Sequence, residues 1–462
     1  MKILTGLANG AILQREKNNL CRTQFEAEAK GTIKSSIGSI KAIGNGIFEL
    51  SGIPVGGPYS IELQDDESKV ALCEIYVGDL WLLGGQSNMD GTGEAMPEDY
   101  EYAQNPSPRV RAFYMDEEWR PAKYDIHNKV IAKEKAHIES VDRWYDFIKS
   151  SGMRMYDAPP YVMKAVVGPG VAFAREMYRI TGGVPQGVIP SAVGGAPIDM
   201  WQPTEDGTEN YYHAALHRIR FAGNNVKGVF WAQGEGYGFP EIYPEKIENI
   251  RRGICEQTGI SKIPFVSMQS FVCSGDGTAE SAIRWSKFRD MQRRMSFEVE
   301  NFTTIATNDC SLCDEIHLDS PSQEKMGIRG ARAMYHLTDG IGFAQPEFDK
   351  IIVEEDKLQP DKYSLLRVRY KNVSGSLASK DLPTGFELCD VNKPEELPSK
   401  HRLCRMTLNQ NEVHLRVQRP MAELADYALC YGYGHYCYCN ITDGEGRALP
   451  SMGPIAIKEY ID

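Results

Sequence analysis

The stretch Gly78-Asp79-Leu80-Trp81-Leu82-Leu83-Gly84-Gly85-Gln86-Ser87-Asn88-Met89 decides the fold class of this chain. Its apolar run ends in paired glycines and a hydroxyl residue, which is how a buried strand of an α/β sheet can deliver a serine to the sheet edge. Ser87 is therefore the candidate nucleophile. A strand followed by an ordinary glycine turn would show the same pattern, because short motifs have a real rate of false matches.

A candidate base for this serine lies far downstream, in Asp314-Glu315-Ile316-His317. A serine hydroxyl is a weak nucleophile and needs a base, which is itself oriented by a third group. Of the nine histidines, only His317 has an aspartate three residues before it, whereas His137 has Glu134 at that spacing within a charged segment. The sequence therefore predicts a triad of Ser87, His317 and Asp314.

Acyl transfer also needs hydrogen-bond donors for the oxygen that becomes negative in the tetrahedral intermediate. Two further apolar strands are predicted, over residues 184–192 and 228–232, and they lead to Gly194 and Gln233. Since parallel strands present their carboxyl ends at one edge of a sheet, these segments are predicted to converge with Ser87. The predicted oxyanion donors are the backbone N–H groups of Ser87 and Gly194 and the side-chain amide of Gln233. The residues expected to support the site are Gln86, Asn88, Gly195 and Glu235.

The pattern along the chain predicts three domains, in keeping with a length of 462 residues. Residues 1–78 consist of short alternating segments between glycines and predict a β-rich domain. Residues 79–344 alternate strand and helix patterns and predict an α/β catalytic domain, with an insertion at about residues 90–165 that is expected to form a wall of the pocket or a solvated excursion. Residues 345–462 predict a second β-rich domain.

Composition limits the kinds of partner. A net charge of −12 argues against nucleic acid or an anionic membrane as the main partner, so a small neutral or modestly charged ligand is expected. No stretch reaches the roughly 18 apolar residues that a membrane span requires. Residues 1–15 lack the features of a secretion signal, so a cytoplasmic location is expected. Oligomeric state is not predicted.

The cysteines number eleven and show no regular spacing, which favours reduced thiols over a disulfide framework. Cys310 and Cys313 form a C-x-x-C pair without a histidine partner in sequence, and Cys437 and Cys439 have the wrong spacing for a zinc knuckle. Neither pair is expected to hold a structural zinc. No metal or other cofactor is expected, because serine, histidine and amide donors already supply nucleophile, base and electrophile.

Four segments together resemble the SGNH (GDSL-like) hydrolase superfamily, in the version found in sialate O-acetylesterases and related carbohydrate acetylesterases. They are Gly85-Gln86-Ser87-Asn88-Met89, Gly194-Gly195-Ala196-Pro197, Gln233-Gly234-Glu235 and Asp314-x-x-His317. The resemblance implies a three-layer α/β/α domain with a parallel sheet, flanked by β-rich domains. It also implies a triad of Ser87, Asp314 and His317.

The chain departs from the family pattern at three points, none of which removes a reactive group. Gly84 precedes Gly85-Gln86-Ser87 where Ser-Gly-Gln-Ser is common, Leu318 follows His317 where proline is common, and Ala196 replaces a common threonine. A further resemblance lies in Arg289-Asp290-Met291-Gln292, where the family usually has Arg-Glu-Ala-Gln.

Three functions remain open on this sequence. The first is a serine esterase that removes O-acetyl groups from a sugar, with sialic acid as the leading substrate. The second is an acetylesterase for plant oligosaccharides of the acetylated xylan type, or for small esters, because the triad contacts only the acyl group. The third is a carbohydrate-binding relative without catalysis, which would be expected to lack Ser87, His317 or Gln233, whereas all three are present.

Overall fold

The computed structural model describes residues 1–93, 106–151, 167–204, 209–235, 241–272, 277–391, 403–436 and 438–461. The described chain is of the mixed α/β class, as predicted. It divides into two units, which are described separately. The first contains residues 1–233, 245–265 and 318–334, and the second contains residues 234–244, 266–317 and 335–462.

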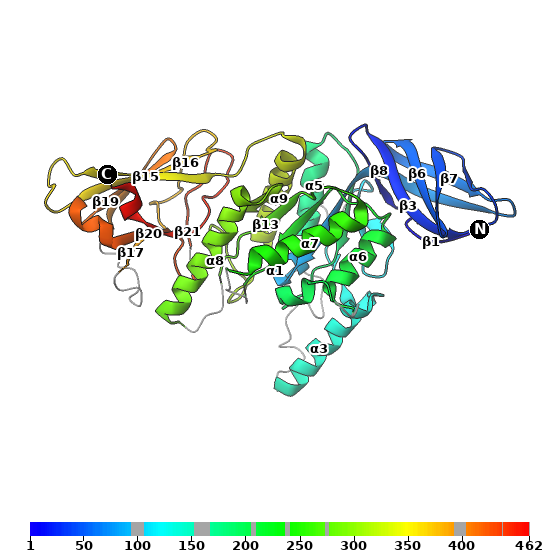
Figure 1. The fold of residues 1–462 in the computed structure, drawn as a ribbon, viewed down its shortest axis with the longest axis horizontal. Coiled ribbons are helices and arrows are strands. Elements are labelled where there is room, and N and C mark those ends of the chain that lie inside the picture. The colour runs from blue at the N-terminus through cyan, green and yellow to red at the C-terminus, as the bar shows by residue number, and fades with distance from the viewer. Residues whose placement is uncertain are drawn as a thin grey trace. The chain divides into compact units, whose positions relative to one another are not determined.

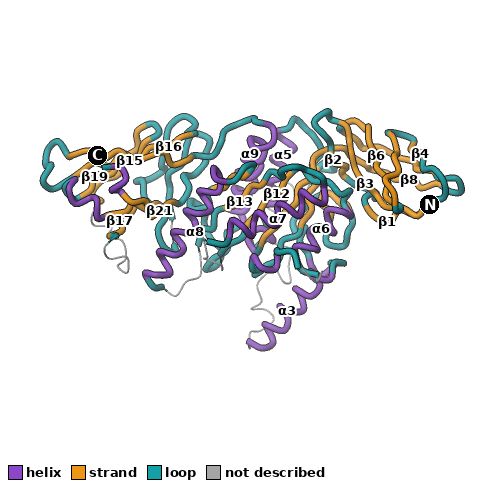
Figure 2. Tube along the Cα trace, in the orientation of Figure 1, coloured by secondary structure: helices purple, strands orange, loops and turns teal. Residues whose placement is uncertain are grey.

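The first unit begins with β strands (Figures 1 and 2). An antiparallel sheet has the order β1-β3-β6-β5. Its strands are β1 (Lys2–Thr5), β3 (Leu20–Glu28), β5 (Ser39–Gly44) and β6 (Ile47–Pro54). Three other strands, β2 (Ile12–Gln14), β4 (Lys34–Ser35) and β7 (Gly56–Gln64), belong with β8 to a different sheet. The β-rich character predicted for residues 1–78 is therefore present.

The long strand β8 (Lys69–Gly85) takes part in two kinds of pairing. Its first half pairs antiparallel with β7 and is partly exposed, whereas every residue from Ile75 to Gly85 is buried. The second half lies between parallel neighbours, β11 (Gln186–Pro190) and β12 (Gly228–Ala232). A strand with parallel neighbours is covered on both faces, which explains why the sequence there is a continuous apolar run. β8 therefore runs without a break through residue 78.

Two strands come from the predicted insertion. β9 (Val110–Phe113) pairs in parallel with β11, and β10 (Trp119–Pro121) pairs antiparallel with β9, so the strand order in this unit is β10-β9-β11-β8-β12. The helix α3 (Lys135–Ser151) follows in the chain. The described part of the insertion is therefore partly regular structure.

Helices pack on the strands through aromatic side chains. Trp81 and Phe230 both contact Phe173 of α5 (Pro169–Ile180), at ring-centroid distances of 5.5 and 5.0 Å. Trp231 instead contacts Trp201 of the 3-10 helix η4 (Ile198–Trp201), at 4.9 Å. Phe230 and Trp231 are consecutive residues of β12, and consecutive residues of a strand point to opposite faces. Phe173 and Trp201 therefore pack on opposite faces of this strand. The remaining helices are α1 (Ser87–Asp90), η2 (Lys129–Ile131), α6 (Tyr211–Phe221), α7 (Tyr243–Thr258) and α9 (Ser320–Asp339).

The second unit contains the end of the α/β alternation and then β structure. The neighbouring strands β13 (Phe265–Met268), which begins at the unit boundary, and β14 (Phe302–Ile305) are separated in sequence by α8 (Ala279–Glu298). Two antiparallel sheets follow, with orders β15-β16-β19-β18 and β17-β20-β21, and they enclose one apolar core. The β-rich character predicted for residues 345–462 is therefore present.

These two sheets are built from β15 (Glu347–Glu355), β16 (Ser364–Lys371), β17 (Phe386–Asp390), β18 (Leu403–Asn409), β19 (Glu412–Val417), β20 (Tyr427–Tyr431) and β21 (Met452–Ala456). Short 3-10 helices, η6 (Met421–Asp426) and η7 (Ile457–Tyr460), lie beside them in sequence. Among the helices within the described ranges, none combines the length and apolar character needed to cross a bilayer.

Candidate active site

Ser87 lies where β8 ends and α1 begins. Gly85 is the last strand residue, with φ +120°, and a Cβ atom there would lie 2.0 Å from the Ala232 carbonyl oxygen. Only glycine fits this position without strain. Gln86 is extended and donates its N–H to the Ala232 oxygen at 2.7 Å, while its own carbonyl accepts from Met89 and Asp90. The turn therefore fixes Ser87 at the carboxyl end of the strand, in a buried position.

The segment after β11 runs alongside this turn. Ser191 N–H donates to Leu83 O at 2.9 Å, and Val193 N–H donates to Gly85 O at 3.1 Å. Gly194 comes next, and Gly195 has φ +70°, a left-handed conformation that glycine adopts without cost. The structure therefore brings Gly194 and Gly195 to the same edge of the sheet as Ser87.

Gln233 reaches that edge from β12. Ala232 pairs with Gly85 in the parallel register, so Gln233 and Gln86 are the first residues beyond their paired strand ends. The Gln233 side chain is buried, with a relative exposure of 1%. Ser87, Gly194 and Gln233 are thus brought together in the first unit, as expected for residues at the carboxyl ends of parallel strands. Glu235, also buried, belongs to the second unit.

Asp314 and His317 form a hydrogen-bonded pair within the second unit. His317 Nδ1–H donates to Asp314 Oδ2 at 2.6 Å, and Asp314 Oδ1 accepts the backbone N–H groups of Ile316 and His317 at 2.9 and 2.8 Å. The turn is closed by a bond from Cys313 N–H to His317 O at 2.9 Å. These contacts orient the imidazole and leave Nε2 as the ring nitrogen that can accept a proton.

The Asp314 carboxyl group is shifted toward its charged form. Burial alone would raise its pKa, but the hydrogen bonds from the His317 ring and from the backbone N–H groups of Ile316 and His317 outweigh burial and lower it. Asp314 is therefore ionised at neutral pH, which is the state that orients a neutral imidazole and stabilises an imidazolium.

The residue after His317 is tied to the residue after Ser87. Leu318 N–H donates to Asn88 Oδ1 at 3.1 Å, and Gln323 Nε2 lies 3.5 Å from the same oxygen, all within the first unit. Asn88 is buried. Through this hydrogen bond Asn88 holds the chain one residue beyond His317.

The other histidine considered as a base, His137, has a different environment. It is fully buried, and Nε2 lies 3.4 Å from Ser191 O. Burial is the main cause that lowers the pKa of His137, and the nearby positive charges of Arg218 and Lys129 lower it further. Glu134 Oε2 lies 3.6 Å from His217 Nδ1, so its side chain is engaged elsewhere.

The described part of the chain contains nine cysteines, and all nine are free thiols in this structure. Cys310 is buried and Cys313 is partly buried beside His317, with Sγ at 3.6 Å from His317 O. Within the described ranges, no three His, Cys, Asp or Glu side chains form a group suited to a metal ion. Cys437 lies outside the described residues.

A buried ion pair that the sequence analysis missed lies beside the candidate nucleophile. Both carboxylate oxygens of Asp90 contact Lys129 Nζ, at 2.5 and 2.6 Å, and Oδ2 also accepts the Gly194 N–H at 2.8 Å. Only 4% of the Asp90 side chain and 10% of the Lys129 side chain are exposed. Asp90 thus links the Ser87 turn to the Gly194 turn. In this structure the Gly194 N–H therefore already has an acceptor.

We expect Lys129→Met to lower the free energy of unfolding by about 3–5 kcal/mol, because it leaves the Asp90 carboxylate buried without its counter-charge. Urea denaturation measures the change. The double variant Asp90→Asn/Lys129→Met removes both charges and is expected to recover much of the loss. Lys133→Met is a matched control, because Lys133 makes an exposed ion pair 3.9 Å long with Glu117. Equal stabilities for Lys129→Met and Lys133→Met would contradict the prediction.

Known proteins resemble this chain in sequence and in fold. A family model described as "Carbohydrate esterase, sialic acid-specific acetylesterase" matches residues 77–336, which is more than half of the chain. A carbohydrate acetylesterase from Xanthomonas citri has a similar fold, with a TM-score of 0.69 and 20% sequence identity over 97% of this chain and 99% of that chain. A protein from Arabidopsis thaliana matches with a TM-score of 0.43 and 18% identity, over 56% of this chain and 99% of that chain. No curated protein matches the chain.

Proposed function

Because the chain belongs to the family of carbohydrate esterases described as sialic acid-specific acetylesterases, we propose that it is a serine esterase that removes O-acetyl groups from a sugar, with sialic acid as the leading substrate. As a member of this family, the chain is a carboxylic ester hydrolase that acts on a carbohydrate acetyl ester. The observation that carries the serine mechanism is the Asp314–His317 pair, because a 2.6 Å hydrogen bond fixes the imidazole in the tautomer that a general base requires.

The proposed nucleophile is Ser87. Its Oγ attacks the acetyl carbonyl carbon while His317 Nε2 accepts the hydroxyl proton, and the carbonyl oxygen becomes an oxyanion. The intermediate collapses to an acetyl-serine, and the sugar oxygen leaves with the proton from His317. Water then attacks the acetyl group by the same steps, which releases acetate and restores the serine. The bond from Leu318 N–H to Asn88 supports this pairing, because it fixes the residue after His317 beside the residue after Ser87.

The proposed oxyanion donors are the backbone N–H of Ser87, the side-chain amide of Gln233 and the backbone N–H of Gly194. The positions of all three at the ends of neighbouring parallel strands support this assignment. The Gly194 N–H donates to Asp90 Oδ2 at 2.8 Å in this structure, so its proposed role in the oxyanion hole requires that this hydrogen bond is shared or broken when the oxyanion forms. Gly195 and Gln86 support the two turns, and Glu235 supports the segment after Gln233. The mechanism uses no metal or cofactor.

Gln233→Ala is expected to lower kcat by roughly 10²-fold to 10³-fold with little change in KM, because a bond to the oxyanion strengthens only as charge develops. Gln233→Glu should be at least as damaging, since a carboxylate places negative charge where a donor is needed. Steady-state kinetics of both variants on one acetyl ester measure the two constants. A rise in KM with unchanged kcat would show instead that Gln233 contacts the sugar in the ground state.

We also propose a three-layer α/β/α arrangement for the unit that carries Ser87. Contacts of Phe230 with α5 and of Trp231 with η4, on different faces of β12, support it. A Cβ atom at Gly330 of α9 would lie 2.5 Å from the Phe230 ring, so this helix packs closely on the same face as α5. The division into residues 1–78, 79–344 and 345–462, with an insertion at about 90–165, is proposed on the sequence pattern.

Acetate release from a panel of substrates tests the proposed function. The panel contains an O-acetylated sialic acid, an acetylated xylo-oligosaccharide and 4-nitrophenyl acetate. Preferred hydrolysis of the sialic acid ester supports the leading assignment, and preferred hydrolysis of the xylan-type ester would replace it with the plant oligosaccharide. Release from none of the three would indicate the carbohydrate-binding relative without catalysis.

A further inference from the structure

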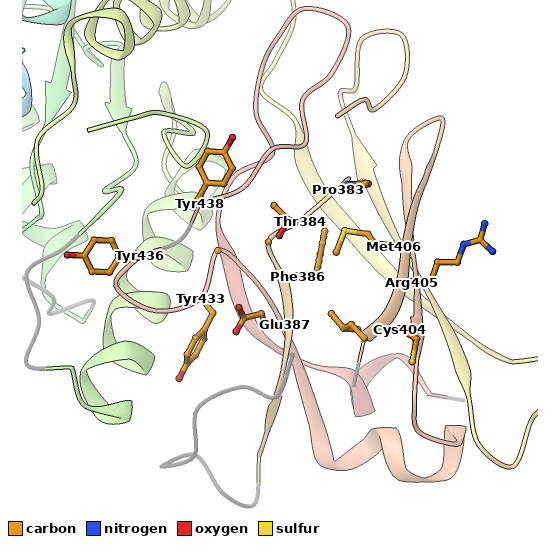
Figure 3. Close-up of a pocket in the computed structure, with 13 residues that line it drawn as sticks. Pro383, Thr384, Phe386, Glu387, Cys404, Arg405, Met406, Tyr433, Tyr436 and Tyr438 are labelled. Carbon is orange, nitrogen blue, oxygen red and sulfur yellow. The ribbon is translucent and has the colours of Figure 1, made fainter. Parts of the chain in front are cut away.

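A pocket of about 280 Å³ lies in the second unit, among the β strands near the C-terminal end of the chain (Figure 3). Its walls come from β17, from β18 and from the segment that follows β20. The side chains that carry the argument are Thr384, Glu387, Arg405, Tyr433, Tyr436 and Tyr438. None of them belongs to the proposed catalytic set. The volume is just below the roughly 300–1,000 Å³ that is usual for small-molecule sites, which suits a single ring better than a long chain.

Two of the tyrosine rings are unusually exposed. Tyr436 and Tyr438 have relative exposures of 72% and 61%, whereas Tyr433 is buried at 8%. In Figure 3 the three rings lie on the opposite side of the pocket from Cys404 and Arg405, and the rings of Tyr436 and Tyr438 point outward in different directions. An exposed ring offers an apolar face and a hydroxyl at once, and a pyranose offers an apolar C–H face and hydroxyl groups. This surface is therefore chemically suited to a sugar ring.

The segment that carries the tyrosines is held on both sides. Arg289 of α8 donates from Nη1 to Gly434 O at 2.6 Å and from Nη2 to His435 O at 3.3 Å. Ser281 Oγ lies 2.9 Å from His435 Nε2. After the tyrosines, Cys439 N–H donates to Asn308 O at 2.7 Å. These contacts fix the backbone just before Tyr436 and just after Tyr438, which lowers the cost of ordering those two residues when a ligand binds.

The charges of the pocket select among sugars. In Figure 3, Glu387 lies on the tyrosine side of the pocket, while the guanidinium group of Arg405 points away from it. A carboxylate accepts hydrogen bonds from sugar hydroxyls but repels an anionic sugar such as a sialate. Burial raises the pKa of the Tyr433 hydroxyl, so this group keeps its proton and can donate. The geometry and charge therefore favour an uncharged ring.

We propose that this pocket is an accessory site that binds a neutral pyranose ring. Tyr436 and Tyr438 each offer an exposed aromatic face at the rim on which a sugar ring of the glycan can stack, and Glu387, Thr384 and Tyr433 supply polar contacts in the pocket. The site goes beyond the proposed esterase reaction, because it recognises a sugar residue without contacting the acetyl ester. It gives the enzyme a means of holding a glycan by a sugar that is not acetylated.

Binding of oligosaccharides without acetyl groups to the full chain tests the proposal, with isothermal titration calorimetry as the measurement. The probes are xylohexaose, cellohexaose, mannohexaose and lactose as neutral sugars, and 3′-sialyllactose as the anionic counterpart of lactose. At least one neutral sugar is expected to bind. The double variant Tyr436→Ala/Tyr438→Ala should weaken this binding by about tenfold or more, because it removes both stacking faces. Hydrolysis of 4-nitrophenyl acetate should be unchanged in that variant.

Two controls make the result specific. Tyr145→Ala removes a partly exposed tyrosine from α3 and should leave sugar binding unchanged. Glu387→Gln keeps the shape of the side chain and should reduce discrimination against 3′-sialyllactose. Absence of binding by every neutral sugar, or binding that the double tyrosine variant does not weaken, would overturn the proposal. Sugar binding without ester hydrolysis would refute only the esterase function, and hydrolysis without sugar binding would refute only the accessory site.

Discussion

Replacing Ser87 with alanine is expected to lower acetate release by on the order of 10⁴-fold to 10⁶-fold, which is the usual loss when a triad nucleophile is removed. The change deletes one oxygen atom from a buried turn whose backbone bonds run through Gln86 and Ala232 instead. The melting temperature should therefore be close to that of the wild type. Acetate release from an acetylated sugar and a thermal melting curve, on the same preparation, measure the two effects.

Ser150→Ala is a matched control for this substitution. Ser150 is an exposed serine of α3, in the same unit as Ser87, and its Oγ donates to Phe147 O at 3.0 Å. Its replacement should leave activity unchanged. A fluorophosphonate should label the wild type and Ser150→Ala at Ser87, and should fail to label Ser87→Ala. More than about a tenth of the wild-type rate in Ser87→Ala, with a normal melting curve, would remove Ser87 as the nucleophile.

The strand ends that carry Ser87, Gly194 and Gln233 could be predicted because parallel strands leave a strong sequence signal. Residues buried on both faces form a continuous apolar run, and the first polar residue beyond it marks the edge of the sheet. The observed β11 lies within the predicted range 184–192, and the observed β12 has the predicted bounds 228–232. The turn geometry at Gly85 follows from the same sequence, since paired glycines allow close approach to Ala232.

The structure of the insertion could not be predicted in the same way. β9 contains only four residues, with Arg111 in its middle, so its apolar run is too short to stand out. Arg111 is nevertheless buried there and donates to the Trp119 carbonyl. The ion pair between Asp90 and Lys129 joins residues that are far apart in sequence. No repeating pattern of apolar and polar residues links the two segments that carry them. Such pairs are set by tertiary packing and leave no local pattern to read.

The pocket in the second unit also could not be predicted from the sequence. The strand β20 lies in the region that was predicted to be β-rich, and the tyrosines that follow it resemble an ordinary aromatic-rich turn in sequence. Just before Tyr436, the carbonyl groups of Gly434 and His435 accept hydrogen bonds from Arg289, about 145 residues away in the chain, and no local sequence pattern indicates this contact. The segment Arg289-Asp290-Met291-Gln292 was noted only for its resemblance to a family element. Its arginine has a structural role in the second unit.

Replacing Asp314 with asparagine is expected to lower kcat by about 10⁴-fold, because the amide can donate to His317 Nδ1 and so stabilise the tautomer that carries its proton on Nε2. That tautomer cannot accept the proton of Ser87.

Asp314→Asn also removes the pH dependence that Asp314 contributes to the free energy of unfolding. Because the folded-state pKa of Asp314 is lowered, this contribution is present above the unfolded-state pKa and is lost as pH falls through the folded-state value.

Glu315→Gln provides the matched control, because Glu315 is an exposed carboxylate adjacent to Asp314, and the hydrogen bonds that hold the His317 ring come from Asp314. It removes the same unit of charge from the same loop, so it corrects for any general electrostatic effect on the substrate. Its kcat should stay within about twofold of the wild type, as for most exposed substitutions away from a reacting group. Steady-state kinetics of both variants between pH 5 and pH 9 give the comparison. Similar losses in Asp314→Asn and Glu315→Gln, or a kcat above about a tenth of the wild type in Asp314→Asn, would show that the 2.6 Å bond to His317 does not orient a catalytic base.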